Sequence, residues 1–159
     1  MNVNIICVGK LKEKYWVQAC EEYTKRLSRF CRLQVTELKE ERLSDNGGAA
    51  EERAVVEAEG RAVLRALERE DYVIALAIQG KALDSLALAG HLEQLGLSGR
   101  GNISFIIGGS LGLSPAVLQR ADLLLSFSAM TFPHQLMRVI LLEQLYRACK
   151  ITAHEKYHK

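Results

Sequence analysis

The sequence predicts one α/β domain in which a mostly parallel sheet carries helices on both faces. Short apolar runs of strand length alternate with longer stretches of helical periodicity along the chain, and this alternation is the pattern of βαβ units. Most of the apolar runs are continuous, as in strands that are covered on both sides. No interior linker, repeat or low-complexity stretch divides residues 1–159, so we expect a single domain.

The first half of the chain predicts four elements: a strand at 3–8, a helix at 13–29, a strand at 33–38 and a helix at 49–69. The second strand alternates apolar and polar residues, so one of its faces is expected in water. The second helix carries Val56, Val63 and Leu67 on one stripe. Its many Glu and Arg residues are expected on the solvated side.

The second half predicts six elements: a strand at 72–78, a helix at 83–95, a strand at 103–107, a short helix from 115, a strand at 123–125 and a helix at 133–150. Gln79-Gly80 is expected to end the first of these strands. Ser114 is expected as the N-cap of the short helix, with Pro115 at its first position. Residues 151–159 form a tail.

Composition and charge limit the class of protein. The chain is 48% hydrophobic and 25% charged, which is ordinary for a globular domain. It has no apolar run of roughly 20 residues and no signal peptide, so we expect a cytoplasmic protein. The four cysteines form no CxxC pair, and no metal site is expected. Basic segments at 10–32 and 126–159 flank an acidic middle; they form either a solvated surface or a patch for an anion such as RNA.

Three predicted strands end in small residues: Gln79-Gly80, Gly108-Gly109-Ser110 and Ser126-Phe127-Ser128. Ligands of open α/β sheets bind beyond the carboxyl ends of the strands, so these ends are the candidate site. The glycine run lacks the GxGxxG spacing, which disfavours a dinucleotide site. It is either a place where backbone meets a ligand or simply a tight connection between strand and helix.

The segment from Ser126 to His134 also has two interpretations. Its small and apolar residues suit a pocket for a flat, largely neutral ligand such as an adenine ring. Alternatively it is a hydrophobic staple ahead of a helix that is capped by Thr131 or Phe132.

The last predicted helix carries the candidate catalytic groups. His134 and Arg138 are four residues apart and share a helix face, although Arg138 can instead be structural and paired with Glu143. This helix is apolar nearly all round, and a partner subunit would cover its outer face. The polar, aromatic tail that follows is either disordered or a surface for bases and phosphates, and its attachment to this helix suggests that it starts near the site.

Several motifs together resemble one family, the RlmH family of bacterial 23S rRNA pseudouridine N3-methyltransferases in the SPOUT superfamily. The resemblance covers the whole chain and is most specific from Ser126 to Arg138. The motifs are Val8-Gly9-Lys10-Leu11-Lys12, Gln79-Gly80-Lys81, Ile107 to Leu113, Leu125 to Arg138, and Tyr157-His158-Lys159.

The resemblance implies a fold, a cofactor and a substrate. The C-terminal segment would be threaded through a loop as an α/β trefoil knot, which general topology rules disfavour. S-adenosyl-L-methionine would be the cofactor, with no metal, and a homodimer would methylate N3 of a pseudouridine in 23S rRNA on the assembled ribosome. The implied cofactor-binding residues are Leu76, Gly108, Phe127, Ser128, Ala129, Met130, Thr131 and Phe132.

The implied chemistry needs a proton acceptor and groups that position the target base. We expect His134 and Arg138 to contact the reacting groups, and Tyr157 and His158 to position the base, with the tail of one subunit completing the RNA site of its partner. His134 and His158 are both candidates for the base, and Arg138 would stabilise the deprotonated substrate. Two alternatives stay open: a SPOUT enzyme for another rRNA or tRNA base, and a non-catalytic ribosome-binding factor.

Overall fold

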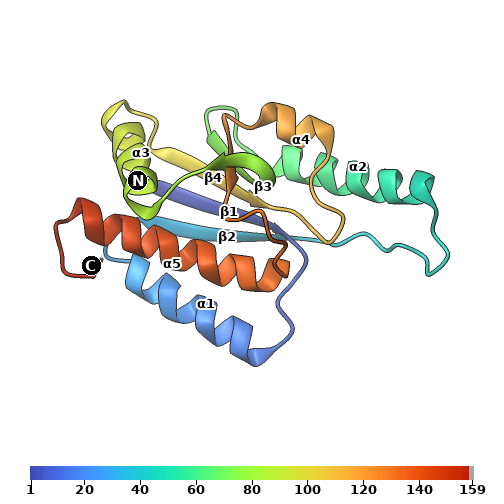
Figure 1. The fold of residues 1–159 in the computed structure, drawn as a ribbon, viewed down its shortest axis with the longest axis horizontal. Coiled ribbons are helices and arrows are strands. Elements are labelled where there is room, and N and C mark those ends of the chain that lie inside the picture. The colour runs from blue at the N-terminus through green and yellow to red at the C-terminus, as the bar shows by residue number, and fades with distance from the viewer. Residues whose placement is uncertain (158–159) are drawn as a thin grey trace.

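The computed structural model describes residues 1–157, which form a five-stranded sheet flanked by helices (Figure 1). The strands are β1 (Asn2–Val8), β2 (Arg32–Leu38), β3 (Tyr72–Ala82), β4 (Asn102–Ile107) and β5 (Leu123–Ser126). The helices are α1 (Lys14–Leu27), α2 (Ala49–Ala66), α3 (Ser85–Leu97), α4 (Pro115–Arg120) and α5 (His134–Thr152). Within residues 1–157 no helix is long and apolar enough to span a membrane.

The sheet has the order β2-β1-β4-β3-β5, and every pair of neighbouring strands is parallel. The predicted α/β fold with a parallel sheet is therefore confirmed. Because all strands run the same way, their carboxyl ends meet at one edge of the sheet. The three predicted segments with small residues, Gln79-Gly80 and the ends of β4 and β5, therefore belong to three neighbouring strands.

Successive side chains of the central strands point to opposite faces, which explains the continuous apolar runs. In β1, Ile5 packs in a core with α1, α3 and α5, whereas Ile6 packs in a second core with α2 and α4. Both side chains are fully buried, and each such burial contributes about 1.5–3 kcal/mol. Helices therefore cover both faces of the sheet, as the sequence predicts.

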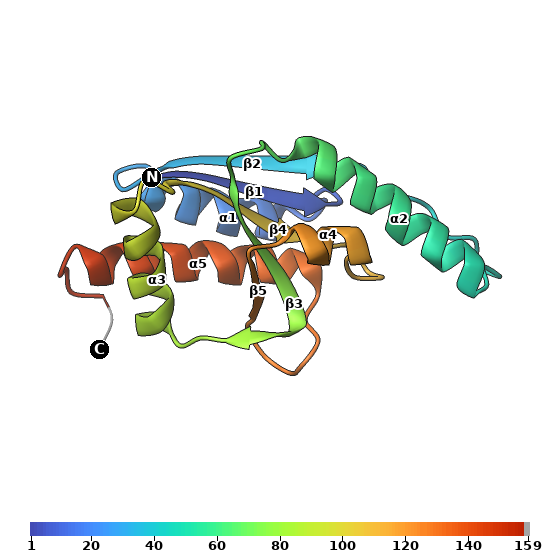
Figure 2. The ribbon, with the colours of Figure 1, turned by 90° about the horizontal axis from the view of Figure 1, so that it is seen from above.

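Helix α5 lies between α1 and α3 on one face of the sheet (Figure 1), and the view from above in Figure 2 shows α3 crossing α5. No residue from 134 to 151 is exposed. Two helices of the same chain thus supply much of the cover that the sequence assigned to a partner subunit. Leu136 and Ile140, one turn apart, are half-buried and belong to neither core.

Strand β3 does not end at Gln79-Gly80 as predicted, because tertiary pairing with β5 extends it. Leu76 and Lys81 both pair with Leu125, so the segment between them leaves the ladder and returns. A Cβ added at Gly80 would lie 2.6 Å from the backbone carbon and oxygen of Leu124. Only glycine fits where β3 passes this close to the backbone of β5.

Helix α2 buries a different stripe from the predicted one. Val55, Glu59, Gly60 and Val63 are buried, while Val56 and Leu67 are only half-buried. Gly60 sets this rotation, because a Cβ there would lie 2.1 Å from Ser114 Oγ. The prediction that the glutamates of this helix are all solvated is therefore wrong for Glu59.

One of the two predicted helix caps is confirmed and the other is wrong. Ser114 caps α4 as predicted: its Oγ accepts from the Val117 amide at 3.3 Å, and Pro115 is the first helical residue. In contrast, α5 begins at His134 with Pro133 at the N-cap and no capping hydrogen bond from a side chain. Thr131 and Phe132 are therefore not helix caps, and they line the crevice instead.

Candidate functional site

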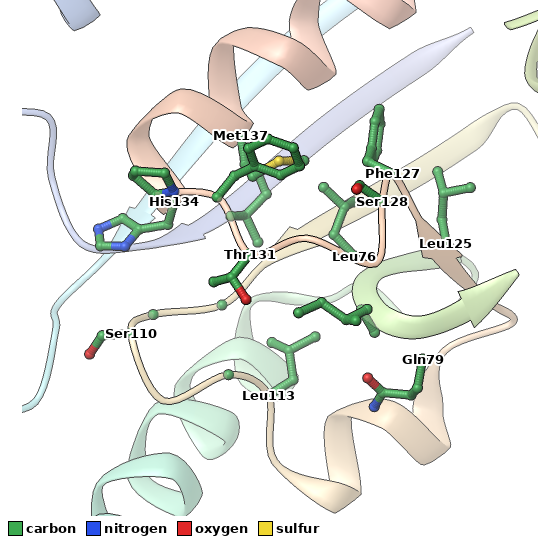
Figure 3. Close-up of a pocket in the computed structure, with 18 of the residues that line it drawn as sticks. Leu76, Gln79, Ser110, Leu113, Leu125, Phe127, Ser128, Thr131, His134 and Met137 are labelled. Carbon is green, nitrogen blue, oxygen red and sulfur yellow. The ribbon is translucent and has the colours of Figure 1, made fainter. Parts of the chain in front are cut away.

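A crevice of about 820 Å³ lies at the carboxyl ends of β3, β4 and β5. Figure 3 shows the loop after β4, with Ser110 and Leu113, facing the loop after β5, with Thr131. Of the eight predicted cofactor-binding residues, seven line it; they are Leu76, Gly108, Phe127, Ser128, Met130, Thr131 and Phe132. Ala129 is exposed and does not line it.

The glycine loop after β4 is a tight connection with a geometry of its own. The Gly112 amide donates to Gly109 O at 3.1 Å, and Gly112 has a φ of +83°, which favours glycine. A Cβ at Gly108 would lie 2.9 Å from Leu113 Cδ2 and 3.0 Å from Gly112 O. A larger residue at Gly108 would therefore disturb this loop as well as any ligand in the crevice.

Two serine hydroxyls shape the loop after β5. Ser126 Oγ donates to Ser128 O at 3.1 Å, and Ser128 Oγ accepts from the Met130 amide at 3.0 Å. The chain is thereby bent so that Thr131 reaches the crevice (Figure 3). Among the described residues, those that line the crevice include no Asp, Glu, Lys or Arg, so its walls suit a ring that carries no charge.

His134 is the ionisable side chain at the rim of the crevice. It is half-buried at the first position of α5 and lies beside the end of β1 (Figure 3). A Cβ added at Gly9 would lie 3.6 Å from His134 Nε2 and 3.6 Å from Glu40 Oε2. The imidazole therefore stands between the crevice and the loop that joins β1 to α1.

Arg138 is not at the crevice, although it is one turn from His134. Its Nη1 donates to Glu37 Oε2 at 2.7 Å and its Nη2 donates to Gly9 O at 3.1 Å. The residue is 4% exposed, and its Nε has no hydrogen-bond partner in residues 1–157. The guanidinium is therefore held by residues at the ends of β1 and β2, and its contact with the reacting groups stays a prediction.

The predicted partner of Arg138, Glu143, instead pairs with Arg147 at 2.6 Å. Sequence reasoning missed Glu37, which also accepts from the Leu11 amide at 3.2 Å. Arg138 and Glu37 are 101 residues apart. No local pattern links them, and only the fold brings them together.

The tail packs against the C-terminal end of α5, away from the crevice. The Tyr157 ring lies 4.8 Å from the Tyr146 ring, and its hydroxyl donates to Glu143 at 3.1 Å. Glu155 pairs with Arg29 at 2.6 Å and also with Lys150. The tail is therefore docked as far as Tyr157, and the prediction that it starts near the site is wrong.

Helix α5 has 19 residues and begins at His134, so its far end, where the tail starts, is about 27 Å from His134 at 1.5 Å per residue. Burial first, and then the Glu143 carboxylate, raise the pKa of Tyr157 to about 12, so this phenol stays protonated at neutral pH. His158, the other tail residue assigned to the site, lies outside the described residues.

The four cysteines are poorly suited to nucleophilic chemistry. Burial is the main cause that raises the pKa of all four thiols, to about 12 for Cys7. They are therefore protonated and poorly nucleophilic at neutral pH. No three His, Cys, Asp or Glu side chains of this part of the chain converge as a metal site would need.

A sequence profile described as a predicted SPOUT methyltransferase matches residues 1–158. The chain belongs to the SPOUT methyltransferase family. Relatives of this methyltransferase from Clostridium novyi (strain NT) and Bifidobacterium adolescentis are 56% and 54% identical to it over 159 residues. The alignments cover all of both chains, and both relatives are named ribosomal RNA large subunit methyltransferase H.

A solved structure, described as a probable methylase family protein from Haemophilus influenzae Rd KW20, resembles this methyltransferase with a TM-score of 0.50 at 11% identity. The match covers 96% of this chain and 66% of that one. At this identity the likeness concerns the fold alone. The knotted threading that the resemblance implied fits the family.

Proposed function

We propose that this methyltransferase uses S-adenosyl-L-methionine to methylate N3 of a pseudouridine in 23S rRNA on the assembled ribosome, in the cytoplasm. The observation that carries the proposal is the full-length similarity to proteins named ribosomal RNA large subunit methyltransferase H. The crevice at the strand ends supports it independently, because it lies where α/β sheets bind ligands.

The residues of the crevice fit this cofactor. Its walls are largely apolar and include no Asp, Glu, Lys or Arg, which suits a neutral adenine ring, and the backbone of Gly108 and of residues 127–132 offers hydrogen-bonding groups. We assign adenine and ribose to these two loops. When bound, S-adenosylmethionine supplies an electrophilic methyl group.

The chain itself must align the target base and accept its N3 proton. Methyl transfer forms an N3–C bond and breaks the S–C bond of the donor, and the N3 proton passes to a base. His134 is the candidate base among residues 1–157, because it is the titratable group on the crevice. Alignment supplies about 7–11 kcal/mol of the barrier reduction. For Arg138 we propose positioning of the loop after β1 rather than contact with the substrate.

A second copy of the chain would complete the site. Tyr157 is docked at the far end of α5, so it reaches a crevice only if that crevice belongs to a partner subunit. Leu136 and Ile140 are half-buried apolar residues outside both cores and suit a dimer contact. We therefore propose a homodimer in which Tyr157 and His158 of one subunit position the base for the other.

The proposal is tested by incubating the protein with ribosomes and methyl-labelled S-adenosylmethionine and then mapping the modified nucleotide. Deproteinised rRNA and tRNA are the comparison substrates. They test the alternative that the enzyme modifies another rRNA base or a tRNA base. Ribosome binding without methyl transfer would instead indicate a non-catalytic factor. Label at a position other than N3 of a 23S pseudouridine overturns the assignment.

The cofactor site is tested by Thr131→Trp. Thr131 is exposed and makes no hydrogen bond through its side chain within residues 1–157, so an indole there fills the crevice with little effect on packing. Calorimetry should show at least a tenfold loss of cofactor affinity with an unchanged melting temperature. Unchanged affinity would place the cofactor elsewhere.

The tail is tested by deleting residues 157–159. Folding should change little and cofactor affinity should fall at most slightly, whereas methyl transfer to ribosomes should fall strongly. A truncated protein that methylates ribosomes at the full rate would remove Tyr157 and His158 from the site.

A further inference from the structure

The loop that joins β1 to α1 and the first turn of α1 present three lysines and an aromatic ring. Lys10, Lys12 and Lys14 are all exposed, and none forms an ion pair with another described residue. Tyr15 follows and is 62% exposed, with the Trp16 ring 5.0 Å away in an edge-on contact. Leu11, between two of the lysines, packs against the core.

This loop starts at the rim of the crevice. Its first residue, Gly9, is buried and has a φ of +94°, and its Cα is next to the imidazole of His134, as the 3.6 Å contact of an added Cβ shows. A substrate base over the crevice would therefore bring its flanking nucleotides to the side where Lys10 begins. Figure 3 shows His134 beside the end of β1.

Hydrogen bonds from the end of β2 and from Arg138 of α5 hold the backbone of the loop in place. The Gly9 amide donates to Leu38 O at 2.9 Å, and Arg138 donates to Gly9 O at 3.1 Å. The Leu11 amide donates to Glu37, whose charge Arg138 offsets at 2.7 Å. Lysines on such a fixed backbone lose less conformational entropy on binding than lysines on a free loop.

Helix stability does not account for this cluster of charge. Lys14 lies in the first turn of α1, which contains no acidic residue, and a cation there opposes the helix dipole. The nearby carboxylates are Glu13 in the loop, Glu37, which is already paired, and Glu40 beside Gly9. The exposed side of the loop is thus positive, and it combines cations with a ring that can stack.

We propose that residues 10–16, from this loop and the first turn of α1, form a contact surface for rRNA on the same subunit whose crevice holds the methyl donor. The lysines neutralise phosphates that flank the target nucleotide, and Tyr15 stacks on an unpaired base. The inference rests on the proposed function for the identity of the RNA. It adds an RNA contact on the subunit that holds the methyl donor to the contact proposed for the tail of its partner.

The test replaces Lys10, Lys12 and Lys14 together by Ala and measures binding to purified ribosomes and methyl transfer over a range of salt. The control variant replaces Arg32, Arg65 and Arg69, which are also exposed and line the hollow at the opposite edge of the sheet. Both variants lose three positive charges. Cofactor affinity and melting temperature are measured on each.

We expect the lysine variant to bind ribosomes at least tenfold more weakly and to keep its cofactor affinity. The slope of log affinity against log salt should fall by about 2, since each neutralised phosphate of single-stranded RNA contributes about 0.7. The arginine variant should stay within twofold of the unmodified protein. Tyr15→Ala should weaken binding about fivefold or more, whereas Tyr15→Phe should not.

Three results would overturn the inference: unchanged ribosome binding by the lysine variant, an equal loss in the arginine variant, or a loss on ribosomes that is absent on deproteinised rRNA. The last result would indicate a ribosomal protein as the partner of the loop. If the lysine variant binds ribosomes more weakly but neither the unmodified protein nor any variant methylates the RNA, the RNA-contact surface is supported and the proposed enzymatic function is wrong.

Discussion

Replacing Glu37 by Gln tests how much the contacts of Arg138 with the ends of β1 and β2 stabilise the fold. The amide keeps the shape of the carboxylate but removes its charge, so Arg138 is left as a cation with neutral partners. Arg138 is 4% exposed, so water cannot replace the lost partner. A buried charge without a counter-ion is costly, whereas an exposed one is not.

The magnitude follows from the two exposures. The side chain of Arg138 is 5% exposed and that of Glu37 is 35% exposed, so the full cost of about 3–5 kcal/mol for breaking a buried pair must be reduced for solvent screening. We expect Glu37→Gln to lower the free energy of unfolding by about 1–3 kcal/mol. For a chain of this length that corresponds to a fall in melting temperature of about 2–12 °C.

The reverse change, Arg138→Met, should cost less than Glu37→Gln. It leaves a carboxylate that water can reach, it fills most of the same volume, and it removes the buried Nε that has no partner in residues 1–157. Urea unfolding of both single variants and of the double variant measures the coupling between the two residues. The double variant should be no less stable than Glu37→Gln alone.

Two results would refute this reasoning. One is a neutral Glu37→Gln, which would mean that the ion pair contributes nothing to the fold. The other is an Arg138→Lys variant that keeps full stability and loop-dependent ribosome binding but loses methyl transfer at saturating substrate, which would return Arg138 to direct catalysis.

Three further predictions follow from packing and charge. Gly80→Ala should lower stability by about 1–3 kcal/mol because its Cβ meets the backbone of β5 at 2.6 Å; Gly90→Ala, whose Cβ meets nothing, is the control in urea unfolding. Burial raises the pKa of Glu59, so its contribution to stability is present below the ordinary pKa of Glu and is lost as pH rises through the raised value. Melting curves from pH 4 to 8 should show this loss in the unmodified protein and not in Glu59→Gln. Leu136→Glu with Ile140→Glu should give folded monomers without methyl transfer, and a monomeric unmodified protein in sedimentation at micromolar concentration would contradict the dimer.

Much of the fold was determined by the sequence alone, because it depends on local signals. The alternation of apolar runs and helical periodicity predicted the layers, since each strand or helix must bury its own apolar residues. Ser114-Pro115 marked a helix start correctly, because capping is decided within one turn. The small residues after β4 and β5 marked the crevice, because parallel strands bring their carboxyl ends to one edge.

The tertiary structure decided what depends on partners far along the chain. Arg138 meets Glu37 across 101 residues, and the extension of β3 depends on β5. Glu59 is buried because Gly60 lets α2 approach Ser114. The tail lies away from the crevice because a helix of 19 residues separates it from His134. Local periodicity contains no information on such distances, since the energy of a long-range contact appears only when the whole sheet and its helices are in place.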